Sequence, residues 1–264
     1  MSLAFSQIDA FTDQAYAGNP AAVIVLTAAR DAVWMQRISR EMNLSETAFL
    51  VRRPEGFDLR WFTPTVEVDL CGHATLASAH ALWESGTLPA SETVRFFTRS
   101  GELSARREEA WIQLDFPVLL QKAATAPPGL LEALGAQAVY VGRNKFDYLV
   151  QVEDEAAVRS LQPRHSELKA LPVRGIVVTA KATLPGVDFV SRFFAPGSGV
   201  DEDPVTGSAH CCLAPYWAEQ LGRADLVGYQ ASSRGGTVRV RTNGDRVLLL
   251  GQAITVIRGE LVRE

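Results

Sequence analysis

Hydrophobic side chains recur along the chain at spacings that predict a mixture of helices and short strands. Trp34, Ile38 and Met42 follow one another at every fourth position, the spacing of one face of an amphipathic helix. Asp31 stands where the N-cap of that helix is expected, so the pattern predicts a helix over 31–42. Shorter apolar runs predict strands, and in the first half they cover 5–11, 21–26, 47–51, 58–62 and 93–97.

A second helix is expected over 73–84, which is rich in Ala and Leu and therefore mostly buried, with its end near Gly86. A strand over 110–116 then leads into the proline-containing, small-residue stretch 121–128, a composition typical of a lobe connection. Further strands are predicted at 139–141, 148–152, 175–179, 189–194, 238–241, 247–250 and 253–257, and helices at 130–134, 155–161 and from Gly207 onward.

The two halves of the sequence resemble each other. Each half has a strand that ends in an F-x-P sequence, then a Gly-polar-Ala helix start, then a Trp about two and a half turns further on. These segments are 60–64, 71–74 and Trp83 in the first half, and 192–196, 206–209 and Trp217 in the second. The repeat predicts two similar lobes, 1–120 and 121–264, each wrapped around one buried helix, with the option that the last strand packs back on the first lobe.

Composition and charge narrow the class of protein. The 264 residues carry 26 Lys and Arg against 30 Asp and Glu, and the evenly spread net charge of −4 indicates neither a nucleic-acid footprint nor a membrane-surface patch. The longest clean aliphatic run, 21–26, is far shorter than the roughly 20 residues that span a bilayer. The first residues have no basic and apolar export signal, so a cytoplasmic globular protein is expected.

The sequence gives no indication of a disulfide framework, a metal or an organic cofactor. Its three cysteines are Cys71, Cys211 and Cys212, without a CxxC pair, and it has only four histidines, so no metal site is expected. Phosphate-binding GxxxxGK[ST], dinucleotide-binding GxGxxG and nucleophile-elbow GxSxG sequences are absent.

The two matching helix starts suggest where a ligand binds. The first N–H groups of a helix have no intrahelical acceptor, and the helix dipole makes that end partly positive. Gly72 and Gly207 would allow a ligand to approach these groups closely. If the lobes face each other, both helix starts converge on one small anionic substrate; alternatively, both glycines are only tight-turn residues.

Residues that transfer protons lie close to these helix starts. Asp203 precedes the second helix, Ser208 is in its first turn, and His73 follows Gly72. Glu46 lies between a polar turn and an apolar strand. Each also has a purely structural interpretation: a loop cap for Asp203, a helix-start residue for Ser208, a hydrogen-bonded structural histidine for His73, and an exposed strand-edge residue for Glu46.

An ordered set of motifs, which spans almost the whole chain, resembles the PhzF-like family of phenazine-biosynthesis isomerases. The motifs are Gly18-Asn19-Pro20, 43–49 (NLSETAF), 62–64 (FTP), 69–77 (DLCGHATLA) and 202–209 (EDPVTGSA). Each block is common by itself, but their order is specific.

The resemblance implies an α+β, diaminopimelate-epimerase-like fold of two pseudo-symmetric lobes, each a mixed sheet or barrel around a central helix. It implies that Glu46 is a general acid/base that moves a proton between carbons of a small carboxylate, supported by His73, Asp203 and Ser208. The resemblance places the substrate carboxylate at the backbone of Gly72, Gly207 and Ser208, with Asn19 as a further binding residue. It also implies a homodimer with no cofactor, and leaves the substrate open.

Two alternatives differ from this hypothesis. Racemases and epimerases of the same fold resemble the chain in having a Cys before the first helix-start Gly, as Cys71 does, but their second thiol corresponds to Thr206 here, and Cys211 is too far along the helix. Cys71 is then a packing residue. The other alternative is a non-catalytic protein that binds small molecules or acts as a scaffold. A pure scaffold would need none of the groups Glu46, His73, Asp203 and Ser208 at the cleft, which argues against it.

Overall fold

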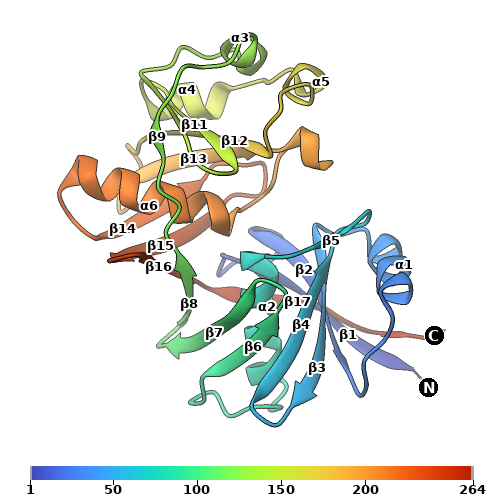
Figure 1. The fold of residues 1–264 in the computed structure, drawn as a ribbon. Coiled ribbons are helices and arrows are strands. Elements are labelled where there is room, and N and C mark those ends of the chain that lie inside the picture. The colour runs from blue at the N-terminus through green and yellow to red at the C-terminus, as the bar shows by residue number, and fades with distance from the viewer. Residues whose placement is uncertain (1, 263–264) are drawn as a thin grey trace. The chain divides into compact units, whose positions relative to one another are not determined.

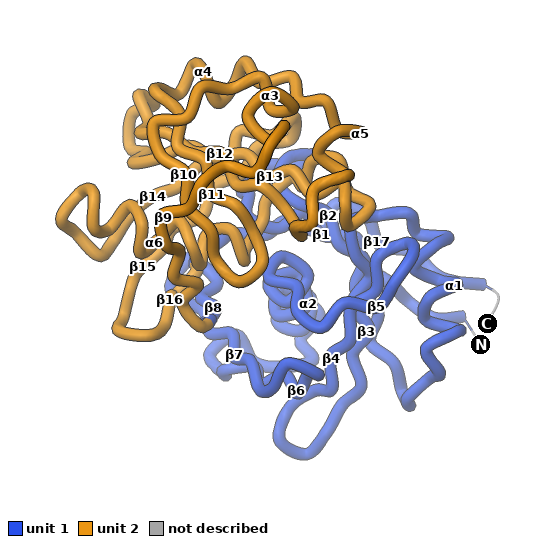
Figure 2. Tube along the Cα trace, turned by 45° about the horizontal axis from the view of Figure 1, so that its top comes forward, with its two compact units in different colours: residues 1–116, 250–264 blue, residues 117–249 orange. Residues whose placement is uncertain are grey.

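The computed structural model describes residues 2–262 and divides them into two compact units. Unit 1 consists of residues 1–116 and 250–264, and unit 2 of residues 117–249 (Figure 2). The C-terminal segment therefore belongs to the same unit as the N-terminus, and its strand β17 (Ala253–Leu261) pairs antiparallel with the first strand of the chain, β1 (Leu3–Ala10).

Unit 1 is a curved mixed sheet with two helices (Figure 1). Its strands are β1 (Leu3–Ala10), β2 (Asn19–Leu26), β3 (Glu46–Arg53), β4 (Gly56–Phe62), β5 (Glu67–Val68), β6 (Val94–Thr98), β7 (Gly101–Glu108), β8 (Trp111–Pro117) and β17 (Ala253–Leu261), and its helices are α1 (Ala32–Met42) and α2 (Gly72–Glu84). The successive pairings β1–β2, β2–β3, β3–β4, β4–β6 and β6–β7 are antiparallel, parallel, antiparallel, parallel and antiparallel.

Helix α2 is the centre of unit 1. Nine of its residues are buried, as expected for a helix that is apolar on most sides, and it contacts β1, β2, β3, β7 and β17. The predicted buried helix is thus confirmed. Helix α1 covers the other face of β3, where Met35 packs with Phe49 and Phe62. The two helices therefore lie on opposite faces of the same strand.

Unit 2 has the same succession of strand directions. Its strands are β9 (Lys122–Ala123), β10 (Tyr140–Arg143), β11 (Asp147–Gln151), β12 (Gly175–Lys181), β13 (Phe189–Phe194), β14 (Asp225–Gln230) and β15 (Gly236–Asn243), and β16 (Arg246–Gly251) contains the boundary between the units. Its helices are α3 (Leu130–Leu134), α4 (Glu155–Ser160), α5 (His165–Leu168), the 3-10 helix η1 (Pro196–Ser198) and α6 (Gly207–Leu221). The pairings from β10 to β15 again alternate as antiparallel, parallel, antiparallel, parallel and antiparallel.

The repeat in the sequence is also a repeat of side-chain interactions. Arg60 on β4 donates two hydrogen bonds to Glu67, at 2.7 and 2.8 Å, and its guanidinium lies over Phe62. In unit 2, Arg192 on β13 makes the same pair of bonds to Glu202, at 2.7 and 2.9 Å, and lies over Phe194. The two units share a central helix, the same succession of strand directions and this ion pair. The predicted α+β class with a pseudo-repeated mixed sheet is therefore confirmed.

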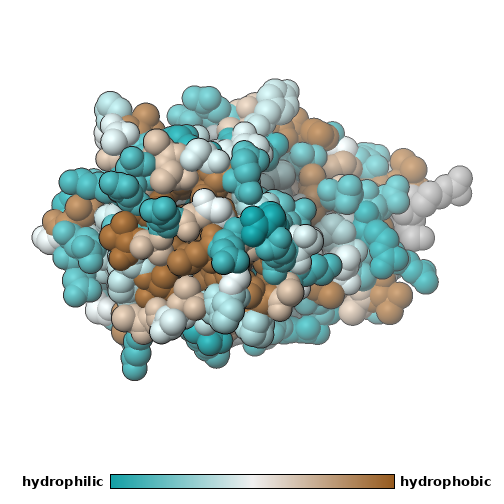
Figure 3. All heavy atoms as spheres, turned by 90° about the horizontal axis from the view of Figure 1, so that it is seen from above, coloured by the Kyte–Doolittle hydropathy of each residue, from teal (hydrophilic) through white to brown (hydrophobic). Residues whose placement is uncertain are grey.

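Large hydrophobic side chains also reach the surface, among them Tyr16, Val33 and Leu120. On the face of the molecule in Figure 3, hydrophobic groups lie among hydrophilic ones. Among the described residues, no helix combines the length and the apolar character that a membrane span requires.

Candidate active site

The local structure before β3 places Glu46 at the start of the strand. Helix α1 ends at Asn43, which adopts the left-handed conformation with φ 50° and donates its N–H to the carbonyl of Ser39. Asn tolerates this conformation better than most residues, so the helix stops there and the chain turns. Glu46 then pairs in parallel register with Ala21 on β2. Its side chain projects to the same face of the sheet as Ala48, towards α2.

Glu46 meets the start of α2 in a cluster of three functional groups, which we call the Glu46 cluster. Nε2 of His73 lies 3.0 Å from Oε2 of Glu46. Sγ of Cys71 lies 3.5 Å from Nδ1 of the same ring. The side chain of His73 is only 5% exposed, whereas that of Glu46 is 17% exposed. The histidine is therefore an internal partner, and the carboxylate is the member of the pair that solvent reaches.

The charges in the cluster follow from burial and from neighbours. Burial opposes a charge on His73, but Cys71 and Glu46 beside the ring outweigh it and raise the pKa of His73 well above its ordinary value. Burial raises the pKa of the Cys71 thiol, and the nearby Glu46 carboxylate raises it further. The three groups are therefore electrostatically coupled, and both Cys71 and Glu46 favour the imidazolium form of His73.

The Glu46 cluster also offers donor atoms of the kinds that transition metals prefer. One ligand atom each from Glu46, Cys71 and His73 lies within 4.8 Å of the others, and thiolate, imidazole and carboxylate ligands suit zinc. To bind here, a metal would have to replace the proton of the thiol and break the ion pair between His73 and Glu46.

In unit 2, a buried glutamine holds the loop before α6. Gln230, fully buried on β14, accepts a hydrogen bond from the Thr206 N–H at 2.9 Å and donates to the Asp203 carbonyl at 2.6 Å. The hydroxyl of Thr206 donates to the carboxylate of Asp203. Sequence reasoning selected Asp203 but missed Gln230 and Thr206, which fix the position of that carboxylate.

Ser208 in the first turn of α6 is oriented by an ion pair between Arg174 and the buried carboxylate of Asp147. Nη2 of Arg174 donates to its hydroxyl oxygen at 3.1 Å. Arg174 also donates from Nε to Asp147 at 2.8 Å, and Nη2 contacts the second oxygen of that carboxylate, which is completely buried. Because Arg174 occupies one acceptor position of the Ser208 oxygen, the serine proton is available to donate to another group. Neither Arg174 nor Asp147 was among the residues predicted.

The remaining predicted binding residues lie at element starts. Gly72 and Gly207 are the first residues of α2 and α6, and neither helix has a side-chain cap at its N-cap residue. Asn19 begins β2 and is completely buried. It lies two positions before Ala21, the register partner of Glu46, so both side chains belong to the same face of the sheet. That one pocket joins the two helix starts stays a prediction.

All three cysteines are buried, and all three are free thiols. The sequence shows no sign of a disulfide framework. Burial raises the pKa of Cys211 to about 12 and that of Cys212 to about 11. A buried neutral thiol is a poor proton acceptor, so neither residue suits the second-thiol role of a racemase.

Comparison with known proteins agrees with this fold. The family model "Phenazine biosynthesis-like protein" (PhzC-PhzF) matches residues 8–259. An uncharacterized isomerase of Halalkalibacterium halodurans is 54% identical over 97% of both chains. The crystal structure of a phenazine biosynthesis protein of the PhzF family from Enterococcus faecalis is 40% identical, with a TM-score of 0.95 over the full length of both chains. A predicted epimerase from Pseudomonas aeruginosa, 22% identical with a TM-score of 0.76, shares the fold.

The repeated mixed sheet around central helices and the names of its relatives place the chain among the isomerases. It belongs to the phenazine biosynthesis-like (PhzC-PhzF) family. The resemblance inferred from the motifs is therefore confirmed.

Proposed function

We propose that this protein is a cofactor-independent isomerase that moves a proton between two carbon atoms of a small carboxylate substrate by general acid/base catalysis. The observation that carries the proposal is the ion pair between Glu46 and His73 at 3.0 Å. It combines a partly exposed carboxylate with an almost completely buried imidazolium, the arrangement that a reversible proton carrier needs.

Glu46 is the group that carries the proton. Its carboxylate removes a proton from one carbon: the C–H bond breaks, an O–H bond forms on Glu46, and the electron pair of the C–H bond moves into the unsaturated system of the substrate. The new carboxylic acid then delivers the proton to a second carbon and returns to a carboxylate. Atoms and electrons balance without an oxidant or reductant.

His73 is a positioning residue in this scheme. Its imidazolium donates a hydrogen bond to Glu46, so it holds the carboxylate in one rotamer. The Cys71 thiol lies beside the ring, at 3.5 Å from Nδ1. Burial raises the pKa of this thiol, which counts against a racemase in which Cys71 is the base.

Unit 2 supplies the supporting groups in this proposal. Asp203 and Ser208 assist the proton shift, and the free N–H groups at the starts of α2 and α6, at Gly72 and Gly207, bind the substrate carboxylate. Asn19 is a further binding residue. Ser208 suits a donor role because Arg174 already donates to its oxygen. A homodimer and a cytoplasmic location also stay predictions.

Deuterium exchange tests the proposal directly. A panel of small unsaturated carboxylates is incubated with the protein in D2O, and NMR detects the loss of C–H signals. We expect deuterium at the carbon that receives the proton. Glu46→Gln should reduce exchange at least 1,000-fold, because an amide cannot accept and return the proton, while substrate binding persists. Glu41→Gln is the matched control, since Glu41 is exposed on α1.

Three further outcomes decide between the proposal and its alternatives. Full exchange by Glu46→Gln would refute the role of Glu46. Loss of exchange in Cys71→Ser with no loss in Glu46→Gln would favour the racemase-type alternative. Saturable binding of a carboxylate without any exchange by the unaltered protein would indicate a non-catalytic binding protein.

A further inference from the structure

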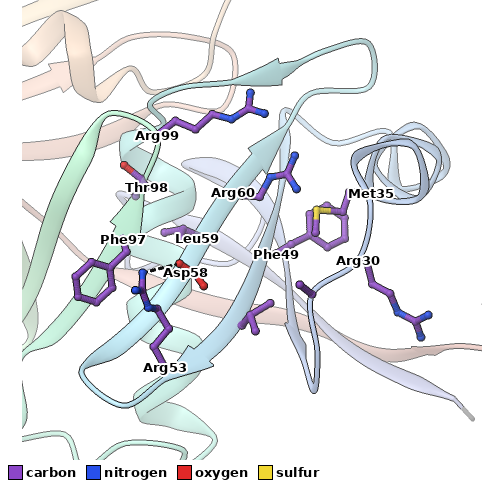
Figure 4. A pocket seen from close by; sticks show the side chains of 12 residues that line it. Arg30, Met35, Phe49, Arg53, Asp58, Leu59, Arg60, Phe97, Thr98 and Arg99 are labelled. Atoms are coloured by element: carbon purple, nitrogen blue, oxygen red, sulfur yellow. Dashed lines mark hydrogen bonds and ion pairs between the residues drawn. The ribbon is translucent and has the colours of Figure 1, made fainter.

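A pocket of about 340 Å³ opens on unit 1, on the face of β3 and β4 that α1 covers only in part. Figure 4 shows its side chains, which come from the start of α1, from β3 and β4, and from the end of β6. Its apolar wall includes Met35, Phe49 and Val51. The volume is at the lower end of the range for pockets that bind small molecules, about 300–1,000 Å³.

This pocket is separate from the Glu46 cluster. Successive side chains of a strand project to opposite faces. Along β3, Glu46 and Ala48 therefore project towards α2, whereas Phe49, Val51 and Arg53 project to the opposite face and line the pocket. A ligand in the pocket would lie across the strand from the proposed proton carrier.

The pocket is lined by four arginines, three of which pair with the two carboxylates of Asp58 and Glu67. Arg53 pairs with Asp58 at 3.0 Å, and Arg60 and Arg99 share the carboxylate of Glu67 at 2.7 and 2.8 Å. Arg30 is the fourth arginine. The carboxylate of Asp69, which is 76% exposed, lies 4.0 Å from Arg99. Because a guanidinium has five N–H donors, these carboxylates leave donors of Arg53 and Arg99 for a bound anion.

Aromatic rings and shared carboxylates hold these guanidinium groups in place. Arg53 lies over Phe97 at 4.4 Å, and Arg60 lies over Phe62 at 5.2 Å. A guanidinium has five N–H donors in one plane, and stacking on a ring leaves the edges of that plane available for hydrogen bonds. Pre-oriented donors lose less conformational entropy on binding an anion than mobile side chains do.

We propose that this pocket is a second binding site, which takes a small organic anion with an apolar body such as an aromatic carboxylate. The apolar body packs against Met35, Phe49 and Val51. The carboxylate accepts charge-assisted hydrogen bonds from the guanidinium groups of the pocket, with Arg53 and Arg99 as accessible donors, at 42% and 54% exposure. A bare inorganic anion would leave the apolar wall without a partner, and a neutral apolar molecule would leave the arginines without one. Both kinds of ligand are therefore disfavoured.

Calorimetric titration with naphthalene-2-carboxylate tests the proposal. We expect saturable binding of one probe molecule at this site, at least tenfold tighter than binding of naphthalene-2-carboxamide, which has the same shape without the charge. The double substitution Arg53→Gln and Arg99→Gln should weaken binding of the carboxylate at least tenfold. Arg106→Gln, which removes an exposed arginine of β7 outside the pocket, should leave it unchanged.

Equal affinity for the carboxylate and the carboxamide would overturn the proposal, and so would an affinity that the double substitution does not change. The second result would also be seen if the probe bound only at the Glu46 cluster. Inorganic phosphate binding as tightly as the naphthoate would refute the role of the apolar wall. The double variant should keep its deuterium exchange, so failure of this proposal is distinguishable from failure of the proposed isomerase activity.

Discussion

Two buried histidines show how neighbouring groups decide a protonation state. His73 and His210 are both buried. Beside Cys71 and Glu46, the pKa of His73 is raised well above its ordinary value. Burial of His210, whose Nδ1 donates to the Thr206 carbonyl at 2.8 Å, lowers its pKa to about 4, because a carbonyl compensates less for lost hydration of the charge than a carboxylate does. One histidine is therefore kept charged and the other neutral.

The titration of His210 should make the protein less stable in mild acid. Its pKa is about 4 in the folded state and 6.5 in the unfolded state, so the unfolded state binds the proton more strongly. Stability is then complete above pH 6.5 and is lost as the pH falls towards 4. Between pH 7.5 and 5.0 this loss is about 2 kcal/mol, and urea unfolding at a series of pH values measures it.

The comparison variant is His210→Gln, which cannot titrate. The substitution will lower the free energy of unfolding at every pH, because the site is fully buried. Between pH 7.5 and 5.0, however, the free energy of unfolding of the variant should fall by about 2 kcal/mol less than that of the unaltered protein. Parallel pH profiles of the two proteins would show that another group causes the acid sensitivity.

Among the elements, α1 depends on a single capping residue. The carboxylate of Asp31 accepts a hydrogen bond from the N–H of Trp34 at 2.8 Å, as the sequence predicted. Asp31→Ala should lower the free energy of unfolding by about 1 kcal/mol, because a helix N–H loses its acceptor. Chemical denaturation measures the change.

Asp31→Asn separates the cap from the charge. An asparagine oxygen can accept the same hydrogen bond, so this variant should keep most of the stability and lose only the contribution of a negative charge near the helix N-terminus. A loss as large as that of Asp31→Ala would mean that the charge, and not the cap, stabilises α1.

Most elements could be predicted from periodicity, and those that were missed have physical reasons. In β7, only Leu103 and Ala105 are buried, so the alternating pattern is too short to recognise. In β14, Gly228 interrupts the pattern. A Cβ at that position would lie 2.5 Å from the ring of Phe189, so tertiary packing and not strand propensity selects glycine there.

The candidate site could be predicted only where function-bearing residues lie in recognisable motifs. Glu46 and His73 were expected together, and the structure places them in contact. Arg174 and Asp147 were missed because their partners are distant in sequence: 27 residues separate them from each other, and 34 separate Arg174 from Ser208. Local patterns carry no information on contacts of that range.

For the molecule as a whole, the absence of a metal requirement is the most consequential expectation. In the proposed mechanism a carboxylate and an imidazolium are sufficient to move the proton. Prolonged dialysis against EDTA should therefore leave the rate of deuterium exchange unchanged within a factor of two. Activity that disappears on dialysis and returns with Zn²⁺ would instead assign Glu46, Cys71 and His73 as metal ligands.

Because the two units repeat the same architecture, equivalent positions in them can be compared directly. The same strand directions and the same arginine–glutamate pair occur twice, yet only unit 1 has the Glu46 cluster. In unit 2 the start of α6 is occupied by Thr206, Gly207 and Ser208, with hydroxyl groups where the first unit has Cys71 and His73. The two units thus share a scaffold but differ in the chemistry at their central helices.

Strand β3 contributes side chains to the Glu46 cluster on one face and to the pocket beside α1 on the other. This limits where sequences of the family can vary in length. Deleting or inserting one residue within Glu46–Arg53 would exchange the sides of every residue beyond the change. Phe49 would face α2, and a neighbour would take its place beneath α1: Ala48 after an insertion before that alanine, Leu50 after a deletion before Phe49. Homologous chains should therefore accept insertions in the turns on either side of this strand, but keep an unbroken count of eight residues within it.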